Sequence, residues 1–143
     1  MTDYFHISMS HGDILNISSL GLAHIGDGVF ELMVRSWLCL RGKVTSKGLH
    51  KATVGYVSAP SQAAMAERIL PILSEEESEV FRRGRNTAPH SVPKASSRGQ
   101  YQTATALEAL FGWLYLRGEH ARLRELFDIA FAENEEKNDE VSE

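Results

Sequence analysis

The fold is decided by residues 18–40, which read SSLGLAHIGDGVFELMVRSWLCL. Apolar residues recur in this stretch at steps of three and four, the spacing that gathers side chains on one face of an α-helix. Ser18 or Ser19 can cap the start of the helix, and Gly42 can end it. The pattern therefore predicts one long amphipathic helix, with Cys39 as a core residue.

The same spacing and the same kinds of capping residue predict further helices along the chain. They are expected over residues 45–57, 58–73, 74–84, 96–116 and 119–131. Pro71 should distort the end of one helix, and Gly84 should end the next. The residues from 85 to 98 are expected to form a polar, basic loop. Since no stretch alternates apolar and polar residues as a half-buried strand does, the predicted fold class is all-α.

Length and composition fit a single domain. The chain has 143 residues, 43% of them hydrophobic, and a net charge of -4. Six acids and one lysine occupy residues 133–143, so residues 1–132 are expected to form the domain and the rest an acidic, disordered tail. The single cysteine excludes an intrachain disulfide framework. No signal-like or membrane-spanning stretch is found, so a cytoplasmic protein without a membrane partner is expected.

Two acidic residues stand where the helical pattern expects core residues. Asp27 and Glu108 each have apolar neighbours at helical spacing in their own predicted helices. A carboxylate in such surroundings costs several kcal/mol unless it is compensated. One interpretation is structural: each acid pairs with Arg35, Arg117 or another base, or lies at the wet edge of the apolar stripe. The other is functional: the two acids share a divalent ion, and Mg²⁺ is the candidate because it binds through few carboxylates.

Four short motifs stand in order along the chain. They are HIGDGVFE at residues 24–31, YVSAPSQ at 56–62, RRGRN at 82–86 and TALEALFGWLYL at 105–116. The first and the last resemble the signature helix and the second acidic helix of the ribonuclease III family. The middle two resemble its short bacterial branch, Mini-ribonuclease III, which has the catalytic domain alone. The resemblance spans about residues 20–131 and implies a single helical endonuclease domain of ribonuclease III type.

The resemblance also implies the chemistry of the site. Asp27 and Glu108 fall on the two acids that hold Mg²⁺ in this family and are essential for cleaving double-stranded RNA, which leaves a 5′ phosphate and a 3′ hydroxyl. Two further acids of the larger enzymes are replaced here by Ala23 and Thr105. Thr105 could still reach the ion through a water. Glu31, one turn beyond Asp27, could help to position the site or be a surface or interface acid.

Two stretches of the chain carry basic residues without any acid, residues 41–66 and 81–105. Clustered Lys and Arg bind phosphates even on a protein with negative net charge. The first candidates for RNA contact are Arg82, Arg83, Arg85, Lys94 and Arg98, and the second are Lys47, His50 and Lys51. Asn86 could bind sugar or phosphate, or hold the start of the loop through an Asx turn. The alternative for all of them is an ordinary solvated surface.

The resemblance also implies a homodimer, whose two related active sites would serve the two antiparallel strands of a duplex. The residues expected at its interface are Phe30, Met33, Val34 and Trp37, which could equally be internal core. In the short branch the implied substrate is the stem of precursor 23S ribosomal RNA. The implied partners are a ribosomal protein or the pre-ribosome.

Two other functions fit the same residues. One is a non-catalytic helical dimer that binds structured RNA, with Asp27 and Glu108 in buried ion pairs. The other is a metal-dependent hydrolase of small phosphate esters. Mg²⁺-dependent cleavage of plain duplex RNA that is lost in Glu108→Gln separates the nuclease from the binding module.

Overall fold

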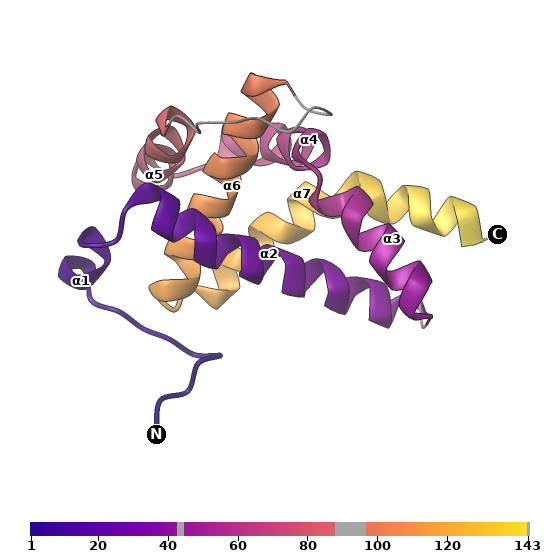
Figure 1. Cartoon of the computed structure of the whole chain (residues 1–143), viewed down its shortest axis with the longest axis horizontal. Coiled ribbons are helices and arrows are strands. Elements are labelled where there is room, and N and C mark those ends of the chain that lie inside the picture. Colours follow the sequence, from indigo (N-terminus) through magenta and orange to yellow (C-terminus); the bar gives the residue numbers. More distant parts are fainter. Residues whose placement is uncertain (43–44, 88–96, 143) are drawn as a thin grey trace.

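The computed structural model describes residues 1–42, 45–87 and 97–142, with side chains described as far as residue 132. Within these ranges the chain forms helices and no strand, which confirms the all-α prediction. The helices are α1 (His11–Leu15), α2 (Ser19–Leu40), α3 (Ser46–Val57), α4 (Ala59–Ile69), the 3-10 helix η1 (Leu70–Ile72), α5 (Glu75–Asn86), α6 (Arg98–Leu116) and α7 (His120–Ser142). The helix α6 is central, because α2, α4, α5 and α7 all pack against it (Figure 1).

The helices α2 and α6 cross at very close range. A Cβ atom added at Gly26 would overlap the carbonyl oxygen of Glu108, and one added at Gly112 would overlap the carbonyl oxygen of Leu22. Only glycine lets two helix backbones come this close. The two glycines therefore fix where α2 lies on α6.

Aromatic rings of three helices form the centre of the core. Phe30 of α2 packs edge-on against Phe111 of α6, with ring centroids 5.6 Å apart, and against Phe127 and Phe131 of α7. Phe30 and Val34 have no exposed surface. The prediction that these two residues form a dimer interface is therefore wrong. The helical period shows that α2 has an apolar face, but it does not show that α7 of the same chain covers that face.

The other predicted interface residues are also engaged within the chain. Met33 and Trp37 are half-buried against the core, and the Trp37 ring lies 5.1 Å from that of Phe131. Cys39, expected in the core, is exposed. Its neighbour Leu38 takes the inward position on the last turns of α2 and is 1% exposed.

The segment between α4 and α5 follows the sequence signals closely. The α-helix ends at Ile69, and Pro71 lies in the 3-10 turn that follows. Ser74 and Glu77 form the predicted capping box, in which the backbone N–H of Ser74 donates to the Glu77 carboxylate at 2.8 Å. These signals set the start of α5 against the core.

The end of α5 differs from the prediction. The helix continues past Gly84 to Asn86, so Arg85 and Asn86 are helical and not part of a loop. A Cβ atom at Gly84 would lie 2.9 Å from the Cβ of Ala109 and 3.0 Å from the Cα of Ala106. Gly84 is therefore a contact point between α5 and α6, and does not end the helix.

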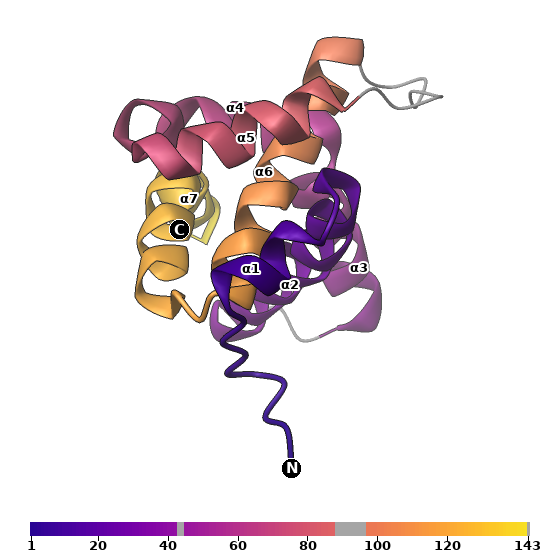
Figure 2. The same ribbon diagram turned by 90° about the vertical axis from the view of Figure 1, so that its left-hand side faces the viewer.

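The two ends of the chain also hold differences. The short helix α1, capped by Ser10, was not expected. Residues before it leave the helical body as an arm (Figure 2), which is attached by a hydrogen bond from the Met9 backbone N–H to the Leu116 carbonyl at 2.7 Å. The backbone of α7 continues to Ser142, where the sequence suggests an unstructured tail. Glutamate favours helix formation, so an acidic composition does not by itself prevent a helix. The domain boundary at residue 132 stays a prediction.

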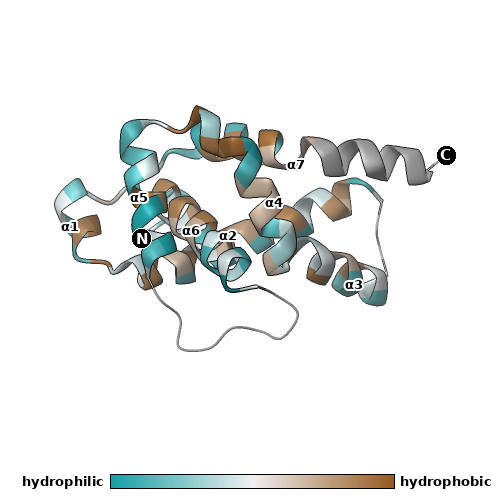
Figure 3. Cartoon of the chain, turned by 90° about the horizontal axis from the view of Figure 1, so that it is seen from above, coloured by the Kyte–Doolittle hydropathy of each residue, from teal (hydrophilic) through white to brown (hydrophobic). Residues whose placement is uncertain are grey.

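Hydrophilic and hydrophobic residues alternate along the helices, as expected when each helix buries one face (Figure 3). Among the described residues, none of the helices combines the length and the apolar content that crossing a membrane requires.

Candidate active site

Asp27 and Glu108, which we call the acidic pair, meet where α2 crosses α6. Asp27 directly follows Gly26, and Glu108 lies one turn before Gly112, so the glycine contact sets the two acids side by side. Asp27 is exposed. Glu108 is half-buried, whereas the other residues from Ala104 to Leu114 are buried. The two carboxyl groups are close enough for Asp27 to raise the pKa of Glu108. The structure thus brings together the two acids that the sequence analysis pairs.

The acidic pair is electrostatically unfavourable without a cation. The pKa of Glu108 is raised to about 8, first because partial burial disfavours its charged form, and then because of the negative charge of Asp27. Glu108 therefore keeps its proton at neutral pH when no cation is bound.

Neither arginine that the sequence offers as a salt-bridge partner lies at the acidic pair. Arg35 pairs with Glu31 at 3.6 Å, and Arg117 pairs with Glu76 at 2.9 Å. In the part of the chain that the structure describes, neither acid of the pair takes part in an ion pair. Among the described residues, Asp27 and Glu108 therefore do not form the buried salt bridges that the structural interpretation requires.

The acidic pair suits a hard divalent cation. Mg²⁺ binds proteins through one or two carboxylates and keeps several waters, which matches two acids at a partly open position. Among the described side chains, no group of three or more His, Cys, Asp and Glu could hold a metal.

The two auxiliary metal residues are placed less favourably. Glu31 forms its ion pair with Arg35 and does not join the acidic pair in such a group. Thr105 donates its hydroxyl hydrogen to the carbonyl oxygen of Tyr101 at 3.0 Å. Only its oxygen is left to accept a hydrogen bond from a water, so its role stays a prediction.

The predicted RNA-contact residues form two exposed groups on different helices. On α5 and at the start of α6 these are Arg82, Arg83, Arg85, Asn86 and Arg98; on α3 they are Lys47, His50 and Lys51. Lys94 lies outside the described residues. Gly84 of α5 packs on Ala106 and Ala109, which flank Glu108 on α6. The members of the first group on α5 therefore lie on a helix that packs beside the acidic pair.

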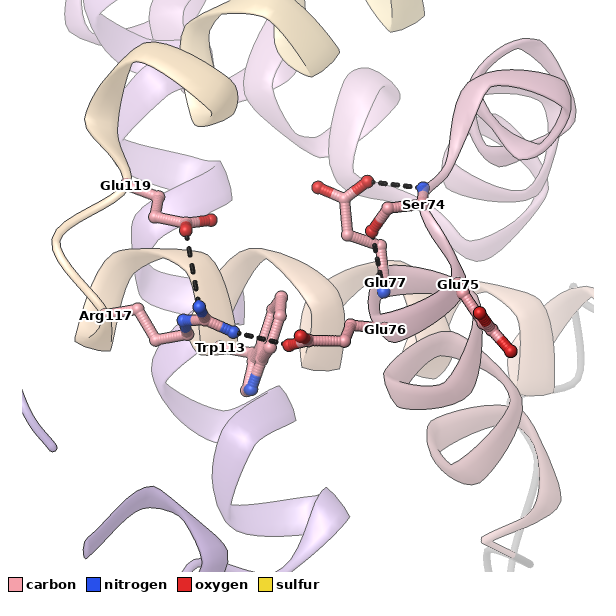
Figure 4. Close-up of a pocket in the computed structure, with 7 residues that line it drawn as sticks. All are labelled: Ser74, Glu75, Glu76, Glu77, Trp113, Arg117 and Glu119. Atoms are coloured by element: carbon pink, nitrogen blue, oxygen red, sulfur yellow. Dashed lines mark hydrogen bonds and ion pairs between the residues drawn. The ribbon is translucent and has the colours of Figure 1, made fainter. Parts of the chain in front are cut away.

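A concavity of about 370 Å³ lies elsewhere, between the start of α5, the end of α6 and the start of α7. Figure 4 shows the Arg117 guanidinium beside the ring of Trp113, reaching Glu76 on one side and Glu119 on the other. Arg117 lies 4.2 Å from the centroid of that ring. None of the predicted site residues lines this concavity, and its internal pairing marks it as a structural contact between helices.

Sequence reasoning missed three residues of this region. Gly26 and Gly112 set the spacing of the acidic pair, and each stands within four positions of an acid in a recognised motif, which is the signal that could have found them. Glu79 pairs with Arg82 and Arg83. It lies just before the acid-free stretch, and its spacing of three and four residues from the arginines predicts the contact.

Comparison with known proteins identifies the family to which the chain belongs. A model of the ribonuclease III domain matches residues 20–119. The Mini-ribonuclease 3 of Symbiobacterium thermophilum is 41% identical over 81% of this chain and 89% of its own length. That of Enterococcus faecalis is 33% identical over 89% of this chain and 98% of its own length. The crystal structure of protein FN1578 from Fusobacterium nucleatum is similar with a TM-score of 0.78 at 29% identity, covering 85% of this chain and 98% of that one. The chain belongs to the ribonuclease III family, in its Mini-ribonuclease 3 branch, and is an endoribonuclease.

Proposed function

We propose that the chain is a Mg²⁺-dependent endoribonuclease whose catalytic and metal-binding residues are Asp27 and Glu108, acting on double-stranded RNA. The observation that carries the proposal is the acidic pair itself. Partial burial and the neighbouring Asp27 raise the pKa of Glu108 to about 8, and within the described chain no base forms an ion pair with either acid. An uncompensated arrangement of this kind is costly unless a cation binds to it.

The two acids have different tasks. Asp27 is exposed and offers its carboxylate from the solvent side, whereas Glu108 holds its carboxyl group on the rigid central helix. Glu108 must release its proton when a cation binds, because its pKa of about 8 keeps it protonated otherwise. Asp27 and Glu108 would hold the Mg²⁺, which when bound would supply an activated water and positive charge at the phosphate.

The products follow from which bond of the phosphodiester breaks. Breaking the bond between phosphorus and the 3′ oxygen leaves a 5′ phosphate on one fragment and a 3′ hydroxyl on the other. The glycine contact between α2 and α6 keeps the separation of the two carboxyl groups fixed during this step.

Recognition of RNA is proposed to rest on the two exposed basic groups. An A-form duplex presents phosphate rows and 2′-hydroxyls along a shallow minor groove, so charge and shape decide its binding. The group on α5 and the start of α6 is our first choice, because α5 packs on α6 beside Glu108. The group on α3 is the second.

The active form is proposed to be a homodimer. Phe30 and Val34 cannot contribute to its interface, because both are buried inside one chain. Apolar residues that α2 leaves exposed are better candidates, and Leu20 and Leu32 are exposed by 53% and 54%. Maturation of 23S ribosomal RNA ends in the cytoplasm, assisted by a ribosomal protein or the pre-ribosome, is the proposed cellular role and rests on the family resemblance alone.

The test is incubation of the wild type, Asp27→Asn and Glu108→Gln with long duplex RNA and Mg²⁺, followed by mapping of the product ends. We expect the wild type to cut both strands with a short 3′ offset. Each variant should lose on the order of 10³-fold or more in rate while staying folded, because removing a metal ligand removes the chemistry. Binding without cutting by the wild type would favour a non-catalytic RNA-binding module, and turnover of free nucleotides would favour a small-ester hydrolase.

A further inference from the structure

Glu79 bridges two of the arginines that the proposed function assigns to RNA. One oxygen of its carboxylate accepts hydrogen bonds from the Arg82 terminal nitrogen at 2.6 Å and from the Arg83 Nε at 3.1 Å. The other oxygen accepts from the Arg82 Nε at 3.1 Å. A single carboxylate thus holds both guanidinium groups, which follow it by three and four residues on α5.

The carboxylate makes the contacts that a phosphate would make. Guanidinium groups bind carboxylates and phosphates with the same two-pronged geometry, so the two ligands compete for one set of N–H donors. The hydrogen bonds from Arg82 and Arg83 hold the pKa of Glu79 below its usual value, which keeps the competing charge in place at neutral pH.

The contact is also easily displaced. The side chains of Arg82 and Arg83 are 61% and 58% exposed, and that of Glu79 is 42% exposed. Ion pairs at such exposed positions contribute little in water, because the solvent screens them. A polyanion that offers several phosphates at once can therefore replace Glu79, whereas an isolated phosphate gains little by doing so.

We propose that Glu79 is a built-in competitor for RNA phosphates, whose carboxylate occupies the Arg82 and Arg83 guanidinium groups in the free protein and is displaced when duplex RNA binds. The inference rests on the proposed function and adds a residue that lowers RNA affinity. The opposite possibility is that Glu79 orients the two arginines for RNA. The two differ in the sign of the effect when the carboxylate is removed.

The test compares affinities for duplex RNA in the full chain carrying Asp27→Asn, so that cleavage does not interfere. Adding Glu79→Gln should tighten RNA binding about three- to tenfold at physiological salt, because the RNA phosphates no longer have to displace a carboxylate from the two guanidinium groups. Glu75→Gln is the matched control, since it removes the same charge from an exposed position at the other end of α5. It should change the affinity less than twofold.

A third comparison isolates the arginines. With Arg82→Ala and Arg83→Ala in place, Glu79→Gln should no longer affect the affinity. Weaker binding of Glu79→Gln, an effect equal to that of Glu75→Gln, or an effect that persists without the arginines would each overturn the inference. Cleavage of duplex RNA by the wild type, measured in parallel, keeps this failure separate from a failure of the proposed function.

Discussion

Two glutamates on neighbouring helices have opposite surroundings. Glu77 of α5 has a side chain only 6% exposed, and it accepts hydrogen bonds of 2.7 and 2.8 Å from Arg122 of α7, which lower its pKa. Glu108 of α6 faces Asp27 instead, and its pKa is raised to about 8. Where the chain supplies the cation, the acid holds the fold together. Where the neighbour is a second acid, no base of the described chain pairs with the glutamate, and we propose that a bound cation takes that place.

The largest expected effect is on the crossing that creates the acidic pair. Gly112→Ala places a Cβ atom against the backbone of α2 at Leu22, so the two helices must separate. We expect a loss of at least about 3 kcal/mol in the free energy of unfolding, measured with urea. Gly28→Ala is the control, since nothing lies within 4 Å of its added Cβ atom. It should stabilise the helix by about 0.5–1 kcal/mol. Equal stability of the two variants would show that the helices do not cross as described.

The next effect concerns the paired glutamate. Arg122→Met leaves Glu77 buried without its cation, and we expect a loss of about 2–4 kcal/mol at pH 7. Because the folded-state pKa of Glu77 is lowered from 4.5, the stability that it contributes is present above pH 4.5 and is lost as the pH falls through its folded pKa. The difference between wild type and variant should therefore shrink in acid. Arg124→Met, at an exposed position of the same helix, should cost less than about 0.5 kcal/mol.

Replacing Glu108 should change the free energy of unfolding in the opposite direction. The folded-state pKa of Glu108 is raised from 4.5 to about 8, so its ionisation costs stability progressively between these values and fully above pH 8. With a chelator present at pH 8.5, Glu108→Gln should be more stable than the wild type by on the order of 1–3 kcal/mol, and equally stable at pH 4. Glu77→Gln should be less stable than the wild type at pH 8.5. If Glu108→Gln and Glu77→Gln were both less stable than the wild type at pH 8.5, both glutamates would stabilise the fold, and the contrast between them would be wrong.

Much of this fold is predictable because its helices begin at local signals. Ser18, Thr45, Ser74 and Ser97 each cap a helix through their own side chains, and such contacts need only the next few residues. Each acid of the pair stands out in the sequence because its neighbours at helical spacing are apolar, but only the family resemblance implied that the two acids meet.

What the sequence could not show depends on contacts between distant segments. Phe30 looks like an interface residue until rings of α7 are seen to pack against it, and Val34 is also buried within the chain. Gly84 looks like the end of a helix until α6 is seen to press against it. The difference between Glu77 and Glu108 is of the same kind, since the partner of Glu77 lies 45 residues away in the chain.

The most direct test of the proposed metal site is calorimetric titration of the wild type, Asp27→Asn and Glu108→Gln with Mg²⁺ in the absence of RNA, with Glu77→Gln as a fourth protein. We expect the wild type and a folded Glu77→Gln to bind the ion, and both variants of the acidic pair to lose this binding. Unchanged Mg²⁺ binding by Asp27→Asn or Glu108→Gln would contradict the proposal.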